Sequence, residues 1–237
     1  MATVLQAQQL WKVYDTGSVK VKALKGVDLD ILEGEMVAIM GPSGCGKTTF
    51  LNCISSLDEI SSGEVLVDGL PLSEMSDRER TDMRKNRLGF VFQSFNLIPV
   101  LSAVENVELP LILKGKSSKD ARVIALDALD AVGLKEWAGH LPAELSGGQQ
   151  QRVTIARAFA HQPALILADE PTGNLDTTTS ESVMKLLVNL NREKGITFVI
   201  VTHEEEIARQ CTRLVTIQDG LITSDERLVE IDGSEEE

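Results

Sequence analysis

Three short runs of apolar residues interrupt the mixed hydropathy pattern of the chain. They are Met36–Met40, residues 164–168 and Phe198–Val201. Apolar runs without polar alternation are typical of strands that are covered on both faces in a parallel sheet. Each run is followed by residues that favour turns and then by a helical pattern. The sequence therefore predicts an α/β fold built around a parallel sheet.

A helix is predicted between the second and third of these runs. Its apolar positions recur at helical spacing and are Val183, Leu186, Leu187 and Leu190. Thr178 and Glu181 have the spacing of a capping box, which predicts the start of the helix, and Gly195 predicts its end. The order strand, helix, strand predicts a βαβ unit.

The N-terminal part of the chain has strand signals with no helix between them. The predicted strands are residues 4–13, 23–31, 64–67 and Leu88–Phe92. We expect these strands to form an antiparallel β layer beside the parallel core. Near the other end, residues 214–217 and 221–224 flank Gln218-Asp219-Gly220 and predict a closing hairpin.

A helical pattern occupies residues 94–160. One apolar stripe consists of Val123, Leu126, Leu129 and Val132. Gly133 would end that helix, and another helix is predicted at residues 147–160. The expected organisation is a single domain made of a β layer with the core (residues 1–93 and 161–228), an inserted α-helical subdomain (94–160) and an acidic tail (229–237).

The composition is that of an ordinary globular protein, with 43% hydrophobic and 25% charged residues. The 23 Lys and Arg against 36 Asp and Glu give a net charge of −13. A chain this acidic is not expected to bind nucleic acid through bulk charge. Three scattered cysteines without a C-x-x-C pair predict reduced thiols in a cytosolic protein and argue against a zinc site.

The sequence predicts neither a secretory signal nor a membrane span. No basic stretch followed by an apolar run begins the chain. The purely apolar runs are far shorter than the roughly 20 residues that a membrane helix needs. If the protein acts at a membrane, we therefore expect another polypeptide to supply the span.

Residues 41–48 fit the motif G-x-x-x-x-G-K-[ST] between a predicted strand and a predicted helix. The backbone N–H groups of such a loop and the N-terminus of the following helix can bind phosphate. The loop residues are Gly41, Ser43, Gly44, Cys45 and Gly46. Lys47 is expected to contact the β- and γ-phosphates, and the Thr48 hydroxyl to bind Mg²⁺. The alternative is a glycine-rich turn without a ligand.

Two adjacent carboxylates follow the second apolar run. Asp169 is expected to end a strand, a position from which a carboxylate can reach Mg²⁺ directly or through water. Glu170 could orient or deprotonate the water that attacks the γ-phosphate. The alternative is a cluster of acidic residues at a helix N-terminus, which needs no ligand.

Leu145-Ser146-Gly147-Gly148-Gln149, followed by Gln150-Gln151-Arg152, resembles the signature motif of the ATP-binding-cassette (ABC) ATPases. Other motifs of that family occur in the expected order. Tyr14 resembles the aromatic residue that stacks on adenine, Gln93 the Q-loop glutamine, residues 173–176 the D-loop and His203 the switch histidine. The resemblance extends over residues 4–227 and implies a RecA-like P-loop core.

The resemblance implies an ATPase that uses ATP and Mg²⁺. The implied magnesium ligands are Thr48, Gln93 and Asp169. The implied catalytic residues are Glu170, His203 and Gln93. Thr49 would join the phosphate loop in binding ATP.

The signature also has a physical meaning as a second anion site. A serine hydroxyl, two glycines and a helix N-terminus together favour an anion. In the family architecture, the signature of one subunit covers the phosphate loop of the other, which implies a homodimer that encloses ATP. The residues that would contact this nucleotide are Ser146, Gly147, Gly148 and Gln149. The alternative is a helix cap followed by a glycine turn.

Finer features resemble the lipoprotein-release and macrolide-export group of the family. They are residues 92–99, residues 105–110 and the Gly-Asn-Leu-Asp form of the D-loop. The resemblance implies a separate transmembrane permease and a cytoplasmic location on the inner face of the membrane. Cys45, where this group often has serine, suggests the hypothesis that oxidation affects the nucleotide site.

Some features have two interpretations. Phe95, Leu97, Ile98 and Val100 are either core residues or a groove for a helix of the membrane partner. His140 and His161 are expected at the surface or at helix ends. The function is either that of a transport motor or that of a regulatory, mechanotransmitting ATPase. A small-molecule kinase and a soluble ABC protein acting on DNA or ribosomes fit less well.

Overall fold

The structure is a computed structural model that describes residues 2–15 and 17–228. The predicted acidic tail at residues 229–237 lies outside the described residues. The chain divides into two compact units, each with its own core. The first unit consists of Met1–Glu74 with Thr197–Glu237, and the second of Met75–Ile196.

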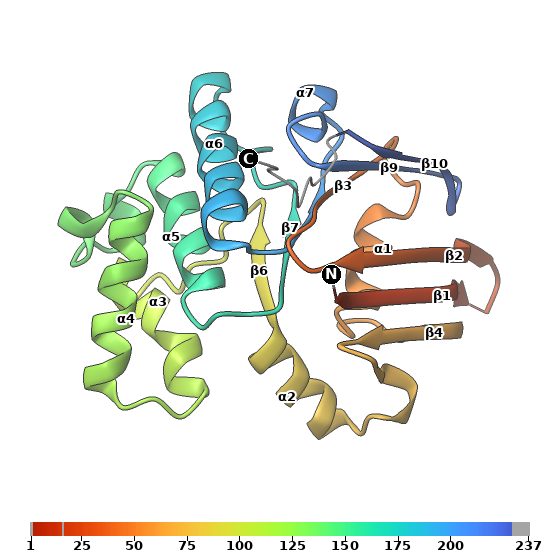
Figure 1. Ribbon diagram of the computed structural model, residues 1–237, viewed down its shortest axis with the longest axis horizontal. Coiled ribbons are helices and arrows are strands. Elements are labelled where there is room, and N and C mark those ends of the chain that lie inside the picture. The colour runs from red at the N-terminus through yellow and green to blue at the C-terminus, as the bar shows by residue number, and fades with distance from the viewer. Residues whose placement is uncertain (1, 16, 229–237) are drawn as a thin grey trace, which may run out of the picture. The chain divides into compact units, whose positions relative to one another are not determined.

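An antiparallel sheet forms one part of the first unit, as the sequence predicted. Its strands are β1 (Thr3–Asp15), β2 (Lys20–Leu32), β4 (Ser62–Val67) and β5 (Leu70–Pro71), in the order β2-β1-β4-β5. Helix α1 (Lys47–Ile54) lies against β1 and β2 (Figure 1) and buries Phe50, Leu51 and Ile54 completely or almost so. The apolar side chains on one face of the antiparallel layer are thereby removed from water.

Parallel strands form the other part of the first unit. Strands β8 (Phe198–Val201) and β9 (Arg213–Gln218) lie in parallel on either side of β3 (Met36–Met40). All four residues of β8 and the first four of β3 are buried, as their unbroken apolar sequence predicted. Strand β10 (Leu221–Arg227) pairs antiparallel with β9, which confirms the predicted hairpin. The short helix α7 (Glu205–Ala208) follows β8.

The prediction for Leu88–Phe92 was wrong in one respect. This strand, β6, does not join the antiparallel layer but pairs in parallel with β7 (Leu165–Asp169) in the second unit. It is also preceded by a helix, α2 (Asp77–Arg87), that the sequence analysis did not anticipate. Met83 is the one buried residue among those of α2, so the helix leaves almost no apolar period in the sequence.

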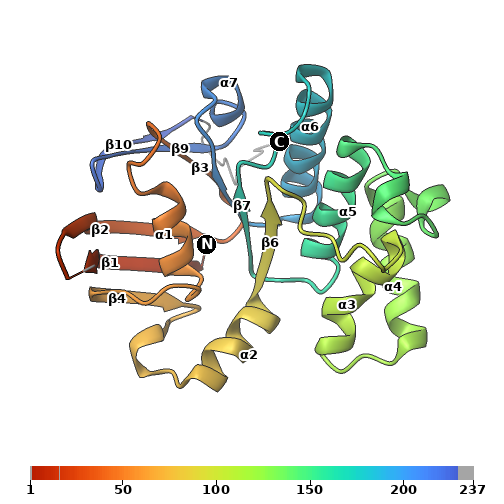
Figure 2. The same ribbon diagram turned by 180° about the vertical axis from the view of Figure 1, so that it is seen from behind.

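The rest of the second unit is mainly helical, as expected. Helices α3 (Ala103–Leu113), α4 (Ser118–Ala131) and α5 (Gly147–Phe159) lie side by side (Figure 2). The predicted stripe on α4 was partly wrong, because Val123 is 56% exposed. The buried residues of α4 are Ala121, Ala125, Ala128 and Leu129. Three of these are alanines, whose small side chains let the neighbouring helices approach closely.

Helix α6 (Thr177–Lys194) follows the D-loop, and its predicted capping box was wrong. Asp176 is the N-cap, and its carboxylate accepts hydrogen bonds from the backbone N–H (3.0 Å) and the hydroxyl (2.6 Å) of Thr179. Thr178 lies inside the first turn. Aspartate is a stronger N-cap than threonine, so the residue type already favours Asp176 over Thr178. Gly195 ends the helix with a φ of 64°, as predicted.

Candidate functional site

The predicted phosphate loop connects β3 to α1 in the first unit. Gly46 is the N-cap of α1 and has a φ of 110°, a left-handed conformation that glycine adopts without strain. The first N–H groups of an α-helix point out of its N-terminal end and not toward a carbonyl of a preceding turn. No acidic residue lies in this first turn to occupy them. The helix end is therefore suited to bind an anion.

The turn of the β9–β10 hairpin holds this loop in place. The backbone N–H of Gly220 donates to the carbonyl of Cys45 (3.0 Å), and the carbonyl of Gly220 accepts from Lys25 (2.8 Å) on β2. The carbonyl of Ile217 comes so close to Gly41 that an added Cβ would lie 2.0 Å from it. The loop conformation thus depends on a hairpin more than 170 residues further along the chain.

Lys47 folds back over the loop. Its Nζ donates to the carbonyls of Gly41 (2.7 Å) and Pro42 (3.0 Å), and the residue is only 8% exposed. The two carbonyls accept two of the three N–H donors of the ammonium group. A phosphate group would offer the same donors a charged acceptor, which makes a stronger hydrogen bond than a neutral carbonyl.

Tyr14 lies at the end of β1 in a polar cluster with Lys12 and Asp58. Its hydroxyl donates to Asp58 (2.7 Å), and Lys12 donates to the other oxygen of that carboxylate (2.6 Å). The Nζ of Lys12 is 4.7 Å from the centre of the Tyr14 ring, within reach of a cation–π interaction. Burial favours a raised pKa of Asp58, but the hydrogen bonds from Lys12 and Tyr14 outweigh it and hold that pKa below its usual value. Burial and the bond to Asp58 raise the pKa of Tyr14.

His203 lies at the same sheet edge as the phosphate loop. It comes two residues after β8, and the preceding Thr202 donates its backbone N–H to the carbonyl of Ile39 on β3 (3.1 Å). Chain segments that leave the carboxyl ends of adjacent parallel strands share one edge. The His203 side chain is exposed.

Cys45 in the phosphate loop is buried. Its burial weakens the hypothesis that oxidants reach the thiol and affect the nucleotide site.

The second unit brings the other predicted residues together. Phe92 and Asp169 are direct partners at the ends of the parallel strands β6 and β7, so Gln93 and Glu170 leave the same edge. Glu170 has a φ of 49°, and its carbonyl accepts from the N–H of Gly173 (3.1 Å) in a tight turn. Gln93, Asp169 and Glu170, whose side chains all carry oxygen atoms, therefore lie at the same edge of the sheet.

The predicted magnesium ligands are Thr48 in the first unit and Gln93 and Asp169 in the second. Among the described residues, no group of three or more His, Cys, Asp and Glu could hold a metal ion. Mg²⁺ is commonly held by one or two carboxylates together with phosphate oxygens and water. The hydroxyl of Thr48, the amide oxygen of Gln93 and the carboxylate of Asp169 are all hard oxygen donors of the kind that Mg²⁺ prefers.

The signature residues begin helix α5. Ser146 is the N-cap and forms a capping box with Gln149, in which Ser146 Oγ accepts from the N–H of Gln149 (3.3 Å) and the Gln149 side chain accepts from the N–H of Ser146 (2.9 Å). A Cβ at Gly148 would lie 2.4 Å from the methyl group of Thr179, at the start of α6. The glycine therefore permits the signature and the D-loop helix to meet.

The segment after Gln93 is held by two side chains from different helices. Arg157 on α5 donates to the carbonyls of Asn96 (2.8 Å) and Phe95 (3.1 Å), two residues with positive φ. The buried side-chain amide of Asn106 on α3 accepts a hydrogen bond from the N–H of Ile98. Its NH₂ group donates to the carbonyls of Ile98, Leu101 and Ser102. The core interpretation for the apolar residues of this segment was wrong, because none of the four is buried. Val100 is 79% exposed.

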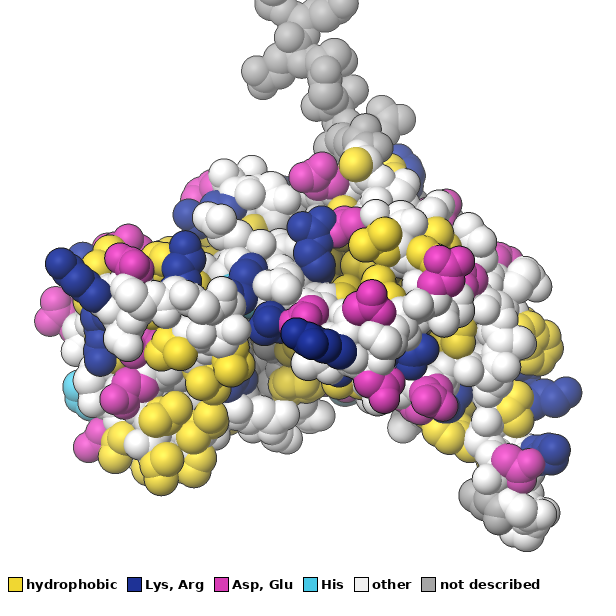
Figure 3. All heavy atoms as spheres, turned by 90° about the horizontal axis from the view of Figure 1, so that it is seen from below, with side chains coloured by type: hydrophobic (Ala, Val, Ile, Leu, Met, Phe, Trp, Pro, Cys, Tyr) yellow, Lys and Arg dark blue, Asp and Glu magenta, His cyan; other side chains and the backbone are white. Residues whose placement is uncertain are grey.

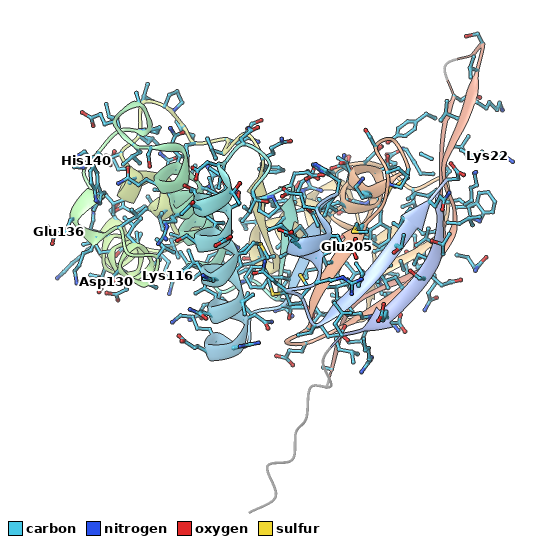
Figure 4. All side chains as sticks on the ribbon, turned by 90° about the horizontal axis from the view of Figure 1, so that it is seen from above. Lys22, Lys116, Asp130, Glu136, His140 and Glu205 are labelled. Carbon is cyan, nitrogen blue, oxygen red and sulfur yellow. The ribbon has the colours of Figure 1, made fainter. Side chains whose placement is uncertain are left out.

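The two remaining histidines behave differently. The ring of His140 packs against that of Trp137 at a tilt of 47°, and Figure 4 shows His140 with Glu136 on the outside of the helical part of the second unit. His161 follows α5, as expected for a helix end, but it is buried and its Nε2 lies 3.1 Å from the carbonyl of Leu88. The pKa of His161 is lowered, and burial is the largest cause of this shift.

The comparisons with known proteins agree with these arrangements. A sequence profile of the family described as ABC transporter matches residues 24–173, which is more than half of the chain. The chain belongs to the ABC transporter family. The predictions of an α/β fold with parallel and antiparallel sheets and of an ATPase are therefore confirmed. Within residues 2–15 and 17–228, no helix of this ABC ATPase has the length and the apolar character needed to cross a bilayer.

Relatives of this ABC ATPase match nearly the whole chain. The uncharacterized ABC transporter ATP-binding protein MJ0796 of Methanocaldococcus jannaschii is 49% identical over 229 residues, covering 95% of this chain and 97% of that protein. The lipoprotein-releasing system ATP-binding protein LolD of Legionella pneumophila is 44% identical over 217 residues, covering 92% and 96%. The predicted similarity to the lipoprotein-release group is thus confirmed.

Solved structures match the fold. A dimeric structure of the MJ0796 cassette has a TM-score of 0.87 and 48% identity, covering 96% of this chain and all of that one. A dimeric post-hydrolysis state of the same cassette, bound to ADP and Pi, also has a TM-score of 0.87, with 47% identity and 96% coverage. Both are structures of MJ0796, and the similarity to them supports the proposals below.

Sequence reasoning did not identify several residues that support the site. Lys12 stands two positions before Tyr14 on a strand, and this spacing places both on one face, so it was open to prediction. Asp58 and Arg157 reach their partners from segments 44 and 62 residues away, and no local pattern announces them. Asn174 was noticed only as a marker of the subgroup.

Proposed function

We propose that this ABC ATPase binds ATP with Mg²⁺ between two copies of the chain and drives a separate membrane permease. One observation carries the proposal. Among the described residues, α1 begins at Gly46 and α5 at Ser146, and the first turn of neither helix contains an acidic residue, which suits both helix ends to an anion. A nucleotide held by the first helix of one copy and the second helix of another would join the two copies head to tail.

The proposed roles follow from the chemistry of each group. Lys47 and the phosphate-loop N–H groups bind the β- and γ-phosphates, and Tyr14 stacks on adenine. Glu170 orients the attacking water and accepts its proton, while His203 binds the γ-phosphate. Mg²⁺, bound by Thr48, Gln93 and Asp169, supplies charge neutralisation of the phosphates. Release of the γ-phosphate removes the contacts that join the two copies.

The permease role is supported by the relatives. The LolD proteins of Legionella pneumophila and Bordetella pertussis are named as ATP-binding proteins of a lipoprotein-releasing system. We propose a comparable role here, in export or extrusion of lipoprotein or macrolide type, with this chain on the cytoplasmic face of the membrane. We also propose that the whole chain works as one ATPase domain in which residues 94–160 form the helical subdomain.

The apolar surface of the second unit is a suitable place for the permease contact. Figure 3 shows hydrophobic side chains at the surface of the end that carries the helices. The exposed apolar residues of the second unit include Val100, Ile112, Leu113 and Leu141. Exposed apolar groups that lie close together mark interaction surfaces more often than chance.

Size-exclusion chromatography of Glu170→Gln tests the ATP-dependent dimer. This variant is expected to bind ATP, to hydrolyse it very slowly and to elute as a dimer with ATP and as a monomer without it. The matched control is Glu170→Gln with Ser146→Arg, which should bind ATP but stay monomeric because the arginine side chain blocks the signature. A Glu170→Gln protein that remains monomeric at saturating ATP contradicts the proposal.

Co-purification and cargo release separate the two functional interpretations. A transport motor should co-purify with a permease and support ATP-dependent release of its cargo from membranes. A regulatory, mechanotransmitting ATPase should co-purify with a membrane partner but release no cargo. Lys47→Ala serves as the control, since it should keep the partner and lose every ATP-dependent effect.

A further inference from the structure

The D-loop and the Q-loop of one chain exchange two hydrogen bonds. The side-chain amide of Asn174 donates to the backbone carbonyl of Gln93 (3.0 Å) and accepts from the side-chain amide of Gln93 (3.2 Å). Both residues belong to the second unit. Asn174 belongs to the Gly-Asn-Leu-Asp segment at residues 173–176, so this contact depends on the second residue of the D-loop.

The pair determines which end of the Gln93 amide faces outward. A backbone carbonyl can only accept, so Asn174 must present its Nδ2 to the carbonyl of Gln93. Its Oδ1 is then the atom that faces the Gln93 side chain, and Gln93 must present its Nε2 there. The carbonyl oxygen Oε1 of Gln93 is consequently the end of the amide that points away from Asn174.

Gly173 lets the Gln93 side chain lie close to the D-loop backbone. A Cβ at Gly173 would lie 2.8 Å from Gln93 Nε2, so the glycine allows the glutamine to approach the D-loop. The N–H of Gly173 donates to the carbonyl of Glu170 (3.1 Å), which ties the D-loop to the end of β7. Asn174 therefore contacts Gln93 from a loop whose backbone is hydrogen-bonded to Glu170, next to Asp169.

We propose that Asn174 is a positioning residue that presents the oxygen of the Gln93 amide, and not its nitrogen, to the metal–nucleotide complex. The inference rests on the proposed role of Gln93 in binding Mg²⁺. A divalent magnesium ion accepts oxygen ligands and is repelled by an N–H donor, so an amide free to turn over spends part of its time in an orientation that cannot bind the ion.

The test measures binding rather than turnover. The affinity for AMP-PNP, an ATP analogue that is not hydrolysed, is measured by titration calorimetry with Mg²⁺ and with EDTA, and the ratio of the two reports the coupling between metal and nucleotide. The variants are Asn174→Ala, Gln93→Ala and both together. The control is Asn189→Ala, which makes the same chemical change at an exposed position on α6.

The expected result is a loss of coupling that acts through Gln93. Asn174→Ala should lower the Mg²⁺/EDTA affinity ratio about twofold or more, since an amide free to turn over presents its oxygen only about half of the time. Its affinity in EDTA and its melting temperature should stay close to those of Asn189→Ala. The double variant should have the same ratio as Gln93→Ala, because a residue that acts through another has no effect once the other is gone.

Different failures have different meanings. If Gln93→Ala leaves the ratio unchanged, the assigned role of Gln93 is wrong, and the inference falls with it. If Gln93→Ala lowers the ratio and Asn174→Ala does not, only the inference about Asn174 is overturned. An effect of Asn174→Ala that adds to that of Gln93→Ala also overturns it, since Asn174 would then act independently.

Discussion

The phenol hydroxyl of Tyr14 is held by the carboxylate of Asp58 at 2.7 Å. The bond joins the end of β1 to the segment that follows α1, the helix of the phosphate loop. The ring is 38% exposed, which leaves part of it available for contact. A ring whose hydroxyl is fixed loses less conformational freedom when a base stacks on it, so the bond prepares Tyr14 for its proposed role.

This relationship predicts that the hydroxyl of Tyr14 contributes to ATP affinity through Asp58. Tyr14→Phe should lower ATP affinity about threefold, and Tyr14→Ala about tenfold or more, because stacking is lost as well. Neither variant should change the affinity for inorganic tripolyphosphate, which has no base. Titration calorimetry with both ligands measures the difference. Equal losses of affinity for ATP and tripolyphosphate would show that Tyr14 stabilises the fold and does not contact the adenine base.

The hairpin turn at Gly220 is predicted to support the phosphate loop from a distance. Gly220 has a φ of 79°, and an added Cβ would lie 2.6 Å from the carbonyl of Ala23. Gly220→Ala should therefore lower both the unfolding free energy and ATP affinity, since the N–H bond to Cys45 would be displaced. The backbone conformation alone costs about 1–2 kcal/mol for alanine.

Gly115→Ala is the matched control for this experiment. Gly115 has a φ of 89°, and an added Cβ would meet nothing within 4 Å. It should show the backbone cost alone, measured by urea unfolding, and no loss of ATP affinity. Similar nucleotide affinities for Gly220→Ala and Gly115→Ala would mean that the hairpin does not hold the loop.

Arg157 is predicted to stabilise the segment after Gln93. Its guanidinium bonds the carbonyls of Phe95 and Asn96, whose φ values are 60° and 52°. Arg157→Met should lower the unfolding free energy by about 1–3 kcal/mol and speed hydrogen exchange in residues 94–102. The unfolding free energy of Arg157→Lys should lie between those of the unmodified protein and Arg157→Met, since an ammonium lacks the planar fork of the guanidinium.

Arg209→Met is the control for the loss of an arginine. Arg209 forms an exposed ion pair with Glu205 at the start of α7, and Figure 4 shows Glu205 on that helix. Exposed pairs of this kind contribute only a few tenths of a kcal/mol. If Arg157→Met is no more destabilising than Arg209→Met, the hydrogen bonds of Arg157 to residues 95 and 96 contribute little to stability.

Buried His161 predicts a loss of stability in mild acid. Because burial lowers the pKa of His161, the native state binds fewer protons than the unfolded state at pH values between this lowered pKa and about 6.5. Stability therefore rises with pH through that window and is lost as pH falls below about 6.5. The slope from one group is at most about 1.4 kcal/mol per pH unit.

Urea unfolding between pH 5 and 8 measures this dependence. His161→Gln keeps a donor that can reach the carbonyl of Leu88 and removes the titration. The variant should have a flatter pH profile below about 6.5. An unchanged slope would show that other groups cause the acid sensitivity.

The amino-acid sequence by itself determined those features that depend on neighbouring residues. The strands β3, β7 and β8 could be predicted because strands covered on both faces leave unbroken apolar runs. The phosphate loop could be predicted because its glycines, lysine and threonine stand at fixed spacing before a helix, and the signature because residues 145–149 resemble the family motif. The family and its ATPase activity follow from the order of such local motifs.

Only the tertiary structure decided which distant segments support them. A polar helix such as α2 has no apolar period, so its presence and the parallel pairing of β6 could not be read from the pattern. The partners Asp58 for Tyr14 and Asn174 for Gln93 are equally hidden. A hydrogen bond between residues 44 or 81 positions apart depends on how the backbone brings two atoms within hydrogen-bonding distance, and no local spacing encodes that distance.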